Sequence, residues 1–403
     1  MRILFVNPKS VNIDALPVPP LGILYLASYA RSRGYTDLKV VDQEFNPFNL
    51  SRADSSITED IKVADIVAIT GTTSQAKNAL SIASIAKKFN KLVIFGGSHA
   101  TFVAKDILRN SEVDIIAIGE GEITFYEILE AVRMGKDFSE ISGIVFKKNG
   151  EIIETSPRPF IRNLDEIPFP AWDLIPFEKY PTRELKRFSG PFTHMMTSRG
   201  CTGKCHFCSS PLLWKYPRFR SAGNVFEEMV QIYERYGIKN IHIHDDAFTL
   251  KKSRAMEVCK LIINSGIDFK WSCQARPDSV DYELFKLMKE AGCAQIEFGV
   301  ESGDEEILKK VCKGYTKEQI RKAFEEAKRA GLTTYGFLIV GLPGETLRTW
   351  IKSVIFAKSL KMDSCIWKIL IPFPGTRIFD EKLVEIIKPD YLEWVYKKAV
   401  IKT

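Results

Sequence analysis

The sequence predicts an α/β protein in two parts, a doubly wound parallel sheet followed by an open, partial (βα)6 barrel. Three observations predict this fold. Short apolar runs alternate with amphipathic helical segments in both halves of the 403-residue chain, which is long enough for two or three domains. A proline-rich stretch separates the halves. Residues 1–200 contain no cysteine, whereas three of the eight cysteines then fall within eight residues.

The first half begins with an apolar run at residues 2–6, which is typical of a strand buried on both faces. An amphipathic helix is expected over 21–33, with Gly34 as its stop signal. Further strands are expected at 38–42, 65–70, 91–97 and 114–122, and further helices at 75–88, 102–109 and 123–134. This alternation predicts the parallel sheet.

Small residues follow three of these strands. They are Thr70, Gly71 and Thr72, then Gly96, Gly97 and Ser98, then Gly119, Glu120 and Gly121. Ligands of such sheets bind beyond the carboxyl ends of the strands, and small residues let a large flat ligand approach the backbone. Alternatively, the glycines only turn the chain. No G-x-G-x-x-G motif follows the first strand, which disfavours a dinucleotide.

Between the halves, residues 143–155 are expected to form a hairpin that turns at Asn149-Gly150. Six prolines then lie between residues 156 and 181, which indicates an extended connector. The expected domains are 1–142, a linker of hairpin and connector at 143–185, the barrel at 186–375, and a short helical extension at 376–403.

In the second half, strands are expected at 193–198, 239–246, 269–275, 294–302, 333–341 and 364–372. Helical segments lie between them, so six βα units follow one another. Such units wind into an open barrel whose active-site residues lie at the carboxyl ends of the strands.

The loop after the first of these strands contains Cys201, Cys205 and Cys208. Three thiolates can hold a 4Fe–4S cluster and leave one iron free for a small ligand. A zinc site completed by His206 is the alternative. The direct succession of Cys205 and His206 disfavours zinc, because ligand spacing usually leaves two or more residues between ligands. The other five cysteines are scattered and are expected to be buried apolar fillers.

The loop Cys201-x-x-x-Cys205-x-Phe207-Cys208 on a six-unit barrel resembles the radical S-adenosylmethionine superfamily. The first half resembles the Rossmann-like, cobalamin-binding domain that precedes the barrel in one branch of that superfamily. The matching segments are Pro19 to Gly22, Gly96 to Ala100, Gly119 to Glu122 and Leu164 to Pro170. The Asp-x-His-x-x-Gly signature of a cobalt-ligating histidine is absent, so cobalamin is expected to bind without one, and His99 is expected only to lie beside the corrin.

The resemblance implies roles for individual residues. Cys201, Cys205 and Cys208 would hold the cluster, and Phe207 would pack beside the adenine of S-adenosylmethionine. Asp245 and Asp246 would contact its ammonium, Arg276 its carboxylate or a ribose hydroxyl, Glu301 and Ser302 the ribose, and Gly341 the adenine. Thr70, Thr72, Gly96, Gly97, Ser98, Gly119, Glu120 and Gly121 would contact cobalamin. His242 and His244, which share one face of a strand, are either interior polar residues or acid/base groups for the substrate.

The implied activity is methylation of an unactivated carbon through a 5′-deoxyadenosyl radical and methylcobalamin. Cobalamin-dependent cyclisation, rearrangement or carbon–carbon coupling is the alternative within the superfamily. A non-catalytic iron–sulfur electron carrier or scaffold is the alternative from another class. The absence of cysteine before residue 201 argues against a methylthiotransferase, which needs a second cluster there. The substrate class stays open among small molecules, lipids and peptides.

The composition of the chain excludes several classes of protein. Hydrophobic residues make up 45% and charged residues 27% of the chain, as in ordinary globular proteins. A net charge of +7 does not predict a nucleic-acid binder. No apolar run approaches the roughly 18 residues of a membrane span. The N-terminus lacks a signal-peptide pattern, so we expect a cytoplasmic protein with reduced thiols.

Positive charge is concentrated in one stretch. Residues 181–220 contain eight lysines and arginines and one acidic residue, Glu184. Because this stretch surrounds the cysteine loop, it predicts a docking surface for an acidic electron donor such as a flavodoxin or ferredoxin, or for an anionic substrate. A solvated basic face is the alternative.

Overall fold

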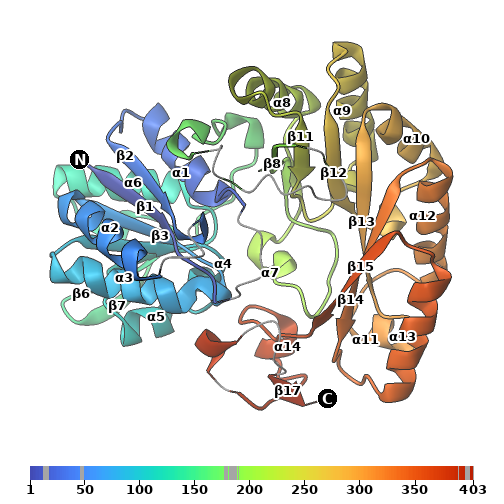
Figure 1. Ribbon diagram of the computed structural model, residues 1–403. Helices are drawn as coiled ribbons and strands as arrows, with labels where there is room; N and C mark the ends of the chain where they lie inside the picture. The colour runs from blue at the N-terminus through green and yellow to red at the C-terminus, as the bar shows by residue number, and fades with distance from the viewer. Residues whose placement is uncertain are drawn as a thin grey trace. The chain divides into compact units, whose positions relative to one another are not determined.

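The computed structural model describes residues 1–11, 18–45, 50–176, 180, 188, 190–388, 390–394 and 400–402. The chain divides into two compact units; Figure 1 shows most of unit 1 in blue to cyan and most of unit 2 in green to red. Unit 1 comprises residues 1–162, 166–181 and 390–395, and unit 2 comprises 163–165, 182–389 and 396–403.

Unit 1 is built on a seven-stranded sheet with the order β2-β1-β3-β4-β5-β6-β7. Its strands are β1 (Ile3–Asn7), β2 (Leu38–Asp42), β3 (Ile66–Thr70), β4 (Leu92–Gly96), β5 (Ile115–Ala117), β6 (Ile144–Lys148) and β7 (Glu151–Glu154). Strands β1 to β5 are parallel, and β6 and β7 extend the sheet in antiparallel pairing.

Helices cover both faces of this sheet. They are α1 (Leu21–Ser32), α2 (Leu50–Val63), α3 (Ala76–Lys88), α4 (Ser98–Phe102), α5 (Ala104–Asn110) and α6 (Glu122–Met134). One core packs α1 and α6 on the sheet, with Ile23 and Phe125 among its members. The other packs α2, α3 and α5, with Ile61 and Ile82 among its members. The predicted doubly wound sheet is therefore confirmed.

Unit 1 differs from the sequence prediction in three places. Helix α2 was not predicted, although β2 and β3 run parallel in the sheet and parallel strands need a crossover. The helix expected at 102–109 is divided into α4 and α5 around Val103. The hairpin at 143–155, expected as the start of a linker, instead pairs with β5 and completes the sheet.

Unit 2 contains a six-stranded parallel sheet whose order, β15-β14-β13-β12-β11-β8, follows the chain. The strands are β8 (Phe192–Met195), β11 (Asn240–Ile243), β12 (Lys270–Ala275), β13 (Cys293–Glu301), β14 (Thr333–Val340) and β15 (Ser364–Ile369). Among the described residues β8 and β15 do not pair with each other, so the barrel is open. The predicted partial barrel of six βα units is confirmed.

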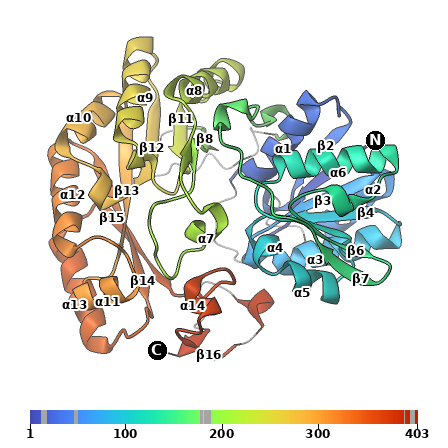
Figure 2. The same cartoon turned by 180° about the vertical axis from the view of Figure 1, so that it is seen from behind.

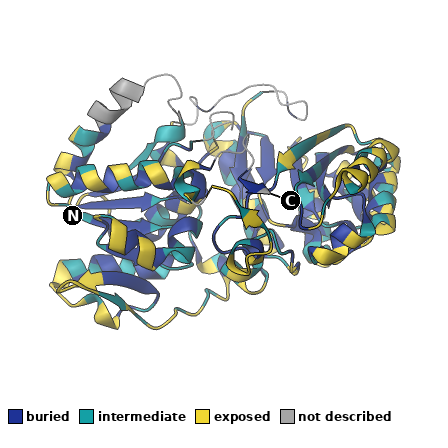
Figure 3. Ribbon diagram, turned by 90° about the horizontal axis from the view of Figure 1, so that it is seen from below, coloured by how far each residue is buried: buried dark blue, intermediate teal, exposed yellow. Residues whose placement is uncertain are grey.

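Helices line the outside of this curved sheet, as the reverse view in Figure 2 shows. They are α8 (Ala222–Tyr236), α9 (Lys252–Ser265), α10 (Tyr282–Glu290), α11 (Glu305–Lys310), α12 (Lys317–Arg329) and α13 (Leu347–Ser359). The core between helices and sheet includes Trp271, Phe298 and Phe324. In Figure 3 the strands of both units are mostly buried, and exposed positions gather on the outer faces of the helices.

A small antiparallel pair interrupts the first βα unit. The strand expected over 193–198 ends at Met195, and the chain then forms β9 (Ser198–Arg199), which pairs with β10 (Arg218–Phe219). The short helix α7 (Ser210–Trp214) lies between β9 and β10. The break has a tertiary cause, because the backbone N–H groups of Thr197 and Ser198 donate to the side chain of Asp245, which follows the neighbouring strand β11.

The segment after residue 375 differs from the helical extension that the sequence predicts. It forms the one-turn helix α14 (Arg377–Asp380) and the antiparallel pair of β16 (Glu385–Ile386) and β17 (Ile401–Lys402). Between these strands, the single turn Tyr391–Glu393 returns to unit 1. No described helix is both long enough and apolar enough to cross a membrane.

The turn from α10 into β13 gives a test of the packing in unit 2. A Cβ atom on Gly292, whose φ is +84°, would lie 2.0 Å from the carbonyl oxygen of Phe269. Gly237 has a similar φ of +67° with nothing within 4 Å, and is the matched control. We expect Gly237→Ala to lower the free energy of unfolding by about 1–2 kcal/mol, the cost of the left-handed backbone.

Gly292→Ala should lower it by more than about 4 kcal/mol, because a buried backbone must also move. Urea unfolding followed by circular dichroism measures both variants. Equal losses in the two variants would contradict the tight packing at Gly292.

Candidate functional site

The predicted small-residue loops of unit 1 meet at the carboxyl edge of its sheet. A Cβ atom on Gly97, whose φ is +95°, would lie 2.9 Å from the carbonyl oxygen of Gly71 and 3.1 Å from Thr70 Oγ1. The loops after β3 and β4 are therefore in backbone contact, and only glycine permits this approach. The next loop joins them, because the N–H of Gly119 donates to Thr101 Oγ1 at 3.0 Å.

The members of these loops do not share one environment. Thr72 is exposed, and its N–H donates to Gln75 Oε1 at 2.9 Å. Gly96 ends β4 and Ser98 begins α4. Gly119 has a φ of +72° and open space where a Cβ would project, whereas a Cβ on Gly121 would lie 2.8 Å from Leu26 Cδ2.

The side chain of Glu120, which the resemblance places in contact with cobalamin, bonds to the connector in this structure. It is 7% exposed, and its Oε2 accepts from the N–H of Ile161 at 2.9 Å. This contact fixes the connector on the sheet edge. The site therefore consists of backbone and hydroxyl groups with open space above Gly119, which fits a broad, flat ligand better than a compact charged one.

His99 is buried within the same edge and is the only histidine before residue 194. Its Nδ1 lies 3.1 Å from Thr73 Oγ1, and its ring packs against Phe95 and Tyr391 at centroid distances of 6.4 and 5.5 Å. Burial lowers the pKa of His99 to about 4, so the ring is neutral. A ring held this way is a packing element, and the contact with Tyr391 was not foreseen from the sequence.

The cysteine loop of unit 2 is anchored at several points. A Cβ on Gly200 (φ +94°) would lie 2.8 Å from the carbonyl oxygen of Tyr216 and 2.9 Å from Trp214 Cβ, so this residue lets the chain after β9 pass close to the end of α7. Farther along, the N–H of His206 donates to the carbonyl of Val311 at 3.0 Å, and its carbonyl accepts from Ile378 at 3.0 Å. The loop is held between α11 and α14.

Two of the three thiols of this loop, those of Cys205 and Cys208, lose their protons less readily than a free thiol. Burial raises the pKa of Cys208 to about 12 and also raises the pKa of Cys205. The positive charges of Lys313 and Arg276 oppose the shift at Cys205. A bound metal removes thiol protons outright, and the two cations then offset the negative charge of the metal–thiolate group. This donor set fits an anionic iron–sulfur cluster.

The zinc alternative finds no support in the geometry. His206 Nε2 lies 3.0 Å from Arg377 Nη1. Ligand atoms of a tetrahedral zinc site lie within about 4 Å of one another. In the described chain, three possible ligand atoms lie within 4.8 Å of one another only at His194, His242 and His244, a group that includes no cysteine.

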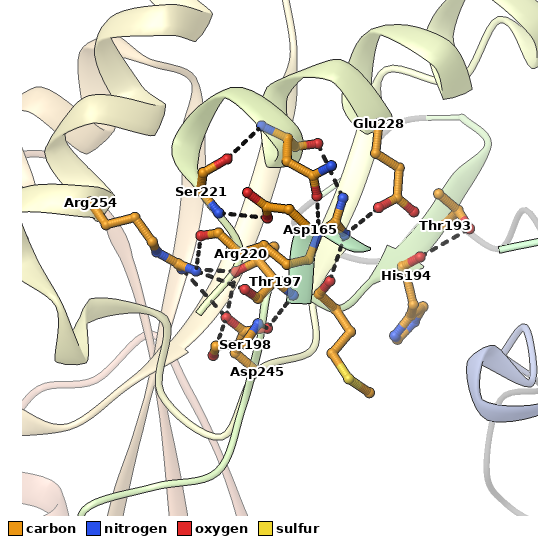
Figure 4. Close-up of polar contacts among 12 residues, drawn as sticks. Asp165, Thr193, His194, Thr197, Ser198, Arg220, Ser221, Glu228, Asp245 and Arg254 are labelled. Atoms are coloured by element: carbon orange, nitrogen blue, oxygen red, sulfur yellow. Dashed lines mark hydrogen bonds and ion pairs between the residues drawn. The ribbon is translucent and has the colours of Figure 1, made fainter. Parts of the chain in front are cut away.

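Asp245 holds the start of the cysteine loop (Figure 4). Its carboxylate accepts from the N–H and hydroxyl of Thr197 at 2.6 and 2.5 Å, and from those of Ser198 at 2.9 and 2.7 Å. Arg254 Nη2 lies 3.6 Å from Oδ2. Both oxygens are thus engaged inside the protein, and the side chain is fully buried. In this structure Asp245 therefore positions the start of the cysteine loop, and its predicted contact with the ammonium stays a prediction.

Asp246, the next residue, remains accessible at the strand end. Its Oδ2 accepts from the hydroxyl of Ser210 at 2.6 Å. Desolvation by the surrounding protein raises its pKa, and the charge of Asp245 adds to this effect. Of the two predicted acidic residues, Asp246 is the one that can meet a cationic ligand group.

Glu301 forms a buried ion pair that the sequence did not reveal. Its Oε1 lies 2.6 Å from Lys313 Nζ, and both side chains are at least nine-tenths buried. Burial opposes the charge of Lys313, but Glu301, Tyr315 and Cys205 together outweigh this effect and raise its pKa well above the usual value. A Cβ on Gly299 would lie 2.4 Å from Glu301 Oε1, so this glycine makes room for the pair.

Two residues of the predicted site, Phe207 and Glu301, lie at this ion pair. Lys313 Nζ lies 5.4 Å from the ring centroid of Phe207, which brings that ring beside the pair. Glu301 itself adopts a φ of +60°, where a β-bulge shifts the register of β13 against β14. A side chain in this backbone region is strained, and such strain is concentrated at functional sites.

The remaining predicted contacts are placed as follows. Ser302 is fully buried, and its Oγ lies 3.1 Å from Ser353 Oγ. The N–H of Gly341 donates to Glu345 Oε2 at 2.6 Å, at a φ of +91°. Arg276 forms a two-pronged ion pair with Asp278, at 2.9 and 2.7 Å. All three therefore have partners within the protein.

A cavity of about 700 Å³ opens beside the cysteine loop. Its cationic lining residues are Lys204, Arg276, Lys309, Lys313 and Arg377. Of the predicted S-adenosylmethionine contacts, Arg276 alone is in this lining, so the cavity adjoins the expected cofactor position without enclosing it. Exposed cations at its mouth include Lys204 and Lys309.

Only part of the predicted basic stretch over 181–220 faces solvent in the described residues, because Lys204 and Lys215 are exposed whereas three arginines are buried. Arg199, Arg218 and Arg220 are 7%, 5% and 5% exposed. Arg220 is paired with the fully buried Glu228. Charges that steer a partner must face solvent, and a linear count of residues does not show this. Residues Arg183, Glu184, Lys186 and Arg187 of that stretch lie outside the described part of the chain.

Comparison with known proteins identifies both units. The family model described as the radical SAM superfamily matches residues 195–357, and the B12 binding domain model matches residues 14–129. An uncharacterised methyltransferase of Pyrococcus horikoshii is 38% identical over 390 residues, which cover 94% of this chain and 83% of the relative.

An anaerobic magnesium-protoporphyrin IX monomethyl ester cyclase of Rubrivivax gelatinosus is 29% identical, over 100% of this chain and 74% of the relative. Among solved structures, the radical S-adenosylmethionine methyltransferase TsrM from Kitasatospora setae, with cobalamin and a [4Fe-4S] cluster bound, has a TM-score of 0.77. It is 19% identical, over 94% of this chain and 74% of that chain, which shows a shared fold.

The contacts of Asp245 predict how the metal site depends on it. Asp245→Asn keeps the side-chain shape but removes the charge that Arg254 and the four donors share, so the start of the loop should loosen. We expect iron bound after anaerobic reconstitution to fall by at least about half, since breaking a buried charged network costs about 3 kcal/mol or more.

Asp246→Asn is the matched control and should bind the full amount of iron, while Cys205→Ala should bind none. Iron analysis and circular dichroism together separate loss of the site from unfolding. Full iron content in folded Asp245→Asn would show that the network does not position the loop.

Proposed function

The chain belongs to the radical S-adenosylmethionine superfamily, in the branch that carries a B12 binding domain, and we propose that it methylates an unactivated carbon of its substrate. The superfamily model and the B12 model match the two units separately, and the relative in P. horikoshii is named a methyltransferase. The single observation that carries the proposal is the pairing of the two domains: the three-cysteine loop lies at the carboxyl end of the first barrel strand, and an open, glycine-lined sheet edge belongs to the B12-binding unit.

The cofactors implied by this family are a 4Fe–4S cluster, S-adenosylmethionine and cobalamin, which together supply a 5′-deoxyadenosyl radical and a transferable methyl group. Cys201, Cys205 and Cys208 would hold the cluster. Lys313 and Arg276 oppose its negative charge, and Glu301 fixes Lys313 in position. These cations are held by the protein before the cluster is assembled.

The residues around the cluster loop also suit the binding of S-adenosylmethionine. Asp246 presents an accessible carboxylate for the ammonium group, beside the loop that Asp245 holds. Phe207 offers an aromatic face near the same loop. Arg276 can reach a carboxylate or a ribose hydroxyl only if it exchanges part of its pairing with Asp278. We therefore assign the larger share of binding to Asp246.

Cobalamin would lie over the loops that contain Thr70, Gly97 and Gly119. At Gly71 and Gly97 the two loops meet through their backbones, so no side chain projects from Gly97. The open space at Gly119 leaves room for a flat ring. His99, the one histidine of residues 1–193, is 2% exposed, and its ring packs between Phe95 and Tyr391, so burial keeps it from an open ligand site. This supports binding without a protein imidazole.

A second candidate function is supported by the similarity to the R. gelatinosus cyclase, which covers the whole of this chain. In that case the substrate radical would close a ring or rearrange, and no methyl group would be transferred. The substrate stays a small molecule, lipid or peptide in either case. All eight cysteines are free thiols, which supports a reducing compartment such as the cytoplasm.

The products of S-adenosylmethionine separate the two functions. The reconstituted protein, supplied with cobalamin, a reductant and candidate substrates, should form both 5′-deoxyadenosine and S-adenosylhomocysteine, measured by mass spectrometry. Cys205→Ala should form neither. Deoxyadenosine without S-adenosylhomocysteine, in the presence of a consumed substrate, would favour the cyclase-like function and contradict methylation.

We propose that an acidic protein, of flavodoxin or ferredoxin type, delivers the electron at the cationic cavity beside the loop. Lys204 and Lys309 are exposed there and can attract an acidic partner, with an effect that salt screens over about 8 Å at physiological ionic strength. The double variant Lys204→Glu, Lys309→Glu should slow turnover several-fold with a protein donor at low salt.

Its turnover with dithionite should stay near the wild-type rate. Lys215→Glu is the control, because Lys215 is exposed in the same region but does not line the cavity. An equal effect of Lys215→Glu, or an equal fall with dithionite, would contradict docking at the cavity.

A further inference from the structure

Three of the five histidines of the chain, His194, His242 and His244, lie together on the first two barrel strands. In the parallel pairing of β8 with β11, His242 is the direct partner of His194, so their side chains lie on the same face. His244 follows two residues later and returns to that face, and its N–H donates to the carbonyl of Met195 at 2.7 Å. The intervening Ile243 belongs to the helix-covered core. The histidines therefore face the inside of the open barrel.

The three rings are close enough to share one small ligand. Their centroids are separated by 5.0, 5.5 and 5.8 Å, and one possible ligand atom from each lies within 4.8 Å of the others. Nitrogen ligands of a tetrahedral metal lie about 3.4 Å apart, so side-chain movements of about 1 Å or less would bring these atoms to that spacing. His194 and His242 are 7% and 3% exposed, whereas His244 is exposed.

Ser272 gives one of the three histidines a hydrogen bond on a ring nitrogen, as is usual in histidine metal sites. His242 Nδ1 lies 2.8 Å from Ser272 Oγ, which belongs to the next strand, β12. With the hydroxyl accepting from Nδ1–H, the lone pair of the imidazole is on Nε2. Metal-bound histidines are usually fixed in this way, because the hydrogen bond on one ring nitrogen sets the tautomer and orients the other nitrogen.

We propose that His194, His242 and His244 bind one divalent transition-metal ion, separate from the iron of the cysteine loop. Imidazole suits zinc, ferrous iron, nickel and copper, and a set of three leaves at least one coordination position for water or an oxygen or nitrogen atom of a substrate. Exposure of His244 provides the entry path. The site does not depend on whether the enzyme methylates or cyclises.

The test uses Zn²⁺ on the full chain with its iron–sulfur cluster reconstituted, so that the cysteines are already occupied. After removal of loosely bound metal with a chelator, we expect about one zinc per chain by elemental analysis. X-ray absorption at the zinc edge should show nitrogen neighbours at about 2.0–2.1 Å rather than sulfur at about 2.3 Å.

Variants assign the ligands. His244→Ala changes an exposed residue and should weaken zinc binding by more than about 100-fold, and Ser272→Ala should weaken it by about 10-fold, as for partners of metal-bound histidines. His206→Ala changes a histidine that does not belong to the group of three, and should bind zinc as tightly as the wild type. Iron content and circular dichroism confirm that each variant is folded and loaded.

Three results would overturn the site: wild-type protein that binds no zinc beyond the chelator wash, zinc bound to sulfur, or zinc affinity unchanged in His244→Ala. Any of these would leave the histidines as metal-free polar groups of the barrel interior.

Discussion

The carboxylate of Asp245 is the constraint on which the rest of unit 2 depends. Four donors from Thr197 and Ser198 converge on it, and Arg254 lies behind it, within the protein interior. A buried charge is stable only when it is paired and hydrogen-bonded, so these groups must stay together once the barrel has formed. They end β8, start β9 and thereby set where the cysteine loop leaves the sheet.

The same principle recurs on the other side of the loop. Lys313 and Glu301 are buried as a pair, in a space that exists because residue 299 is glycine. The positive charge of Lys313 acts on Cys205, and its Nζ lies over the ring of Phe207. Fixed charges that are in place before a cofactor binds need little reorganisation during the reaction, which is how enzymes use such groups. In unit 1, by contrast, the loops at the carboxyl edge of the sheet are held by backbone contact between Gly71 and Gly97.

Several expectations failed for one reason, which is that a sequence pattern does not report burial. The sequence predicts that the arginines at 199, 218 and 220 form a charged surface, yet all three are buried. Arg220, for example, is paired with Glu228. Asp245 and Asp246 are adjacent and chemically identical, and only their surroundings make one a structural anchor and leave the other accessible. The hairpin at 143–155 was located correctly, but its place as the edge of the sheet was not.

The sequence by itself determined the fold class, the order of the sheet strands and of most helices, the cysteine loop and the small-residue loops. These features depend on local periodicity and spacing, which are properties of neighbouring residues. Only the tertiary structure decided which side chains face a ligand, because that depends on contacts between residues far apart in the chain. The ion pair of Glu301 with Lys313, the ring of Tyr391 on His99, and the meeting of His194 with His242 arise only when the strands and loops that carry them pack together.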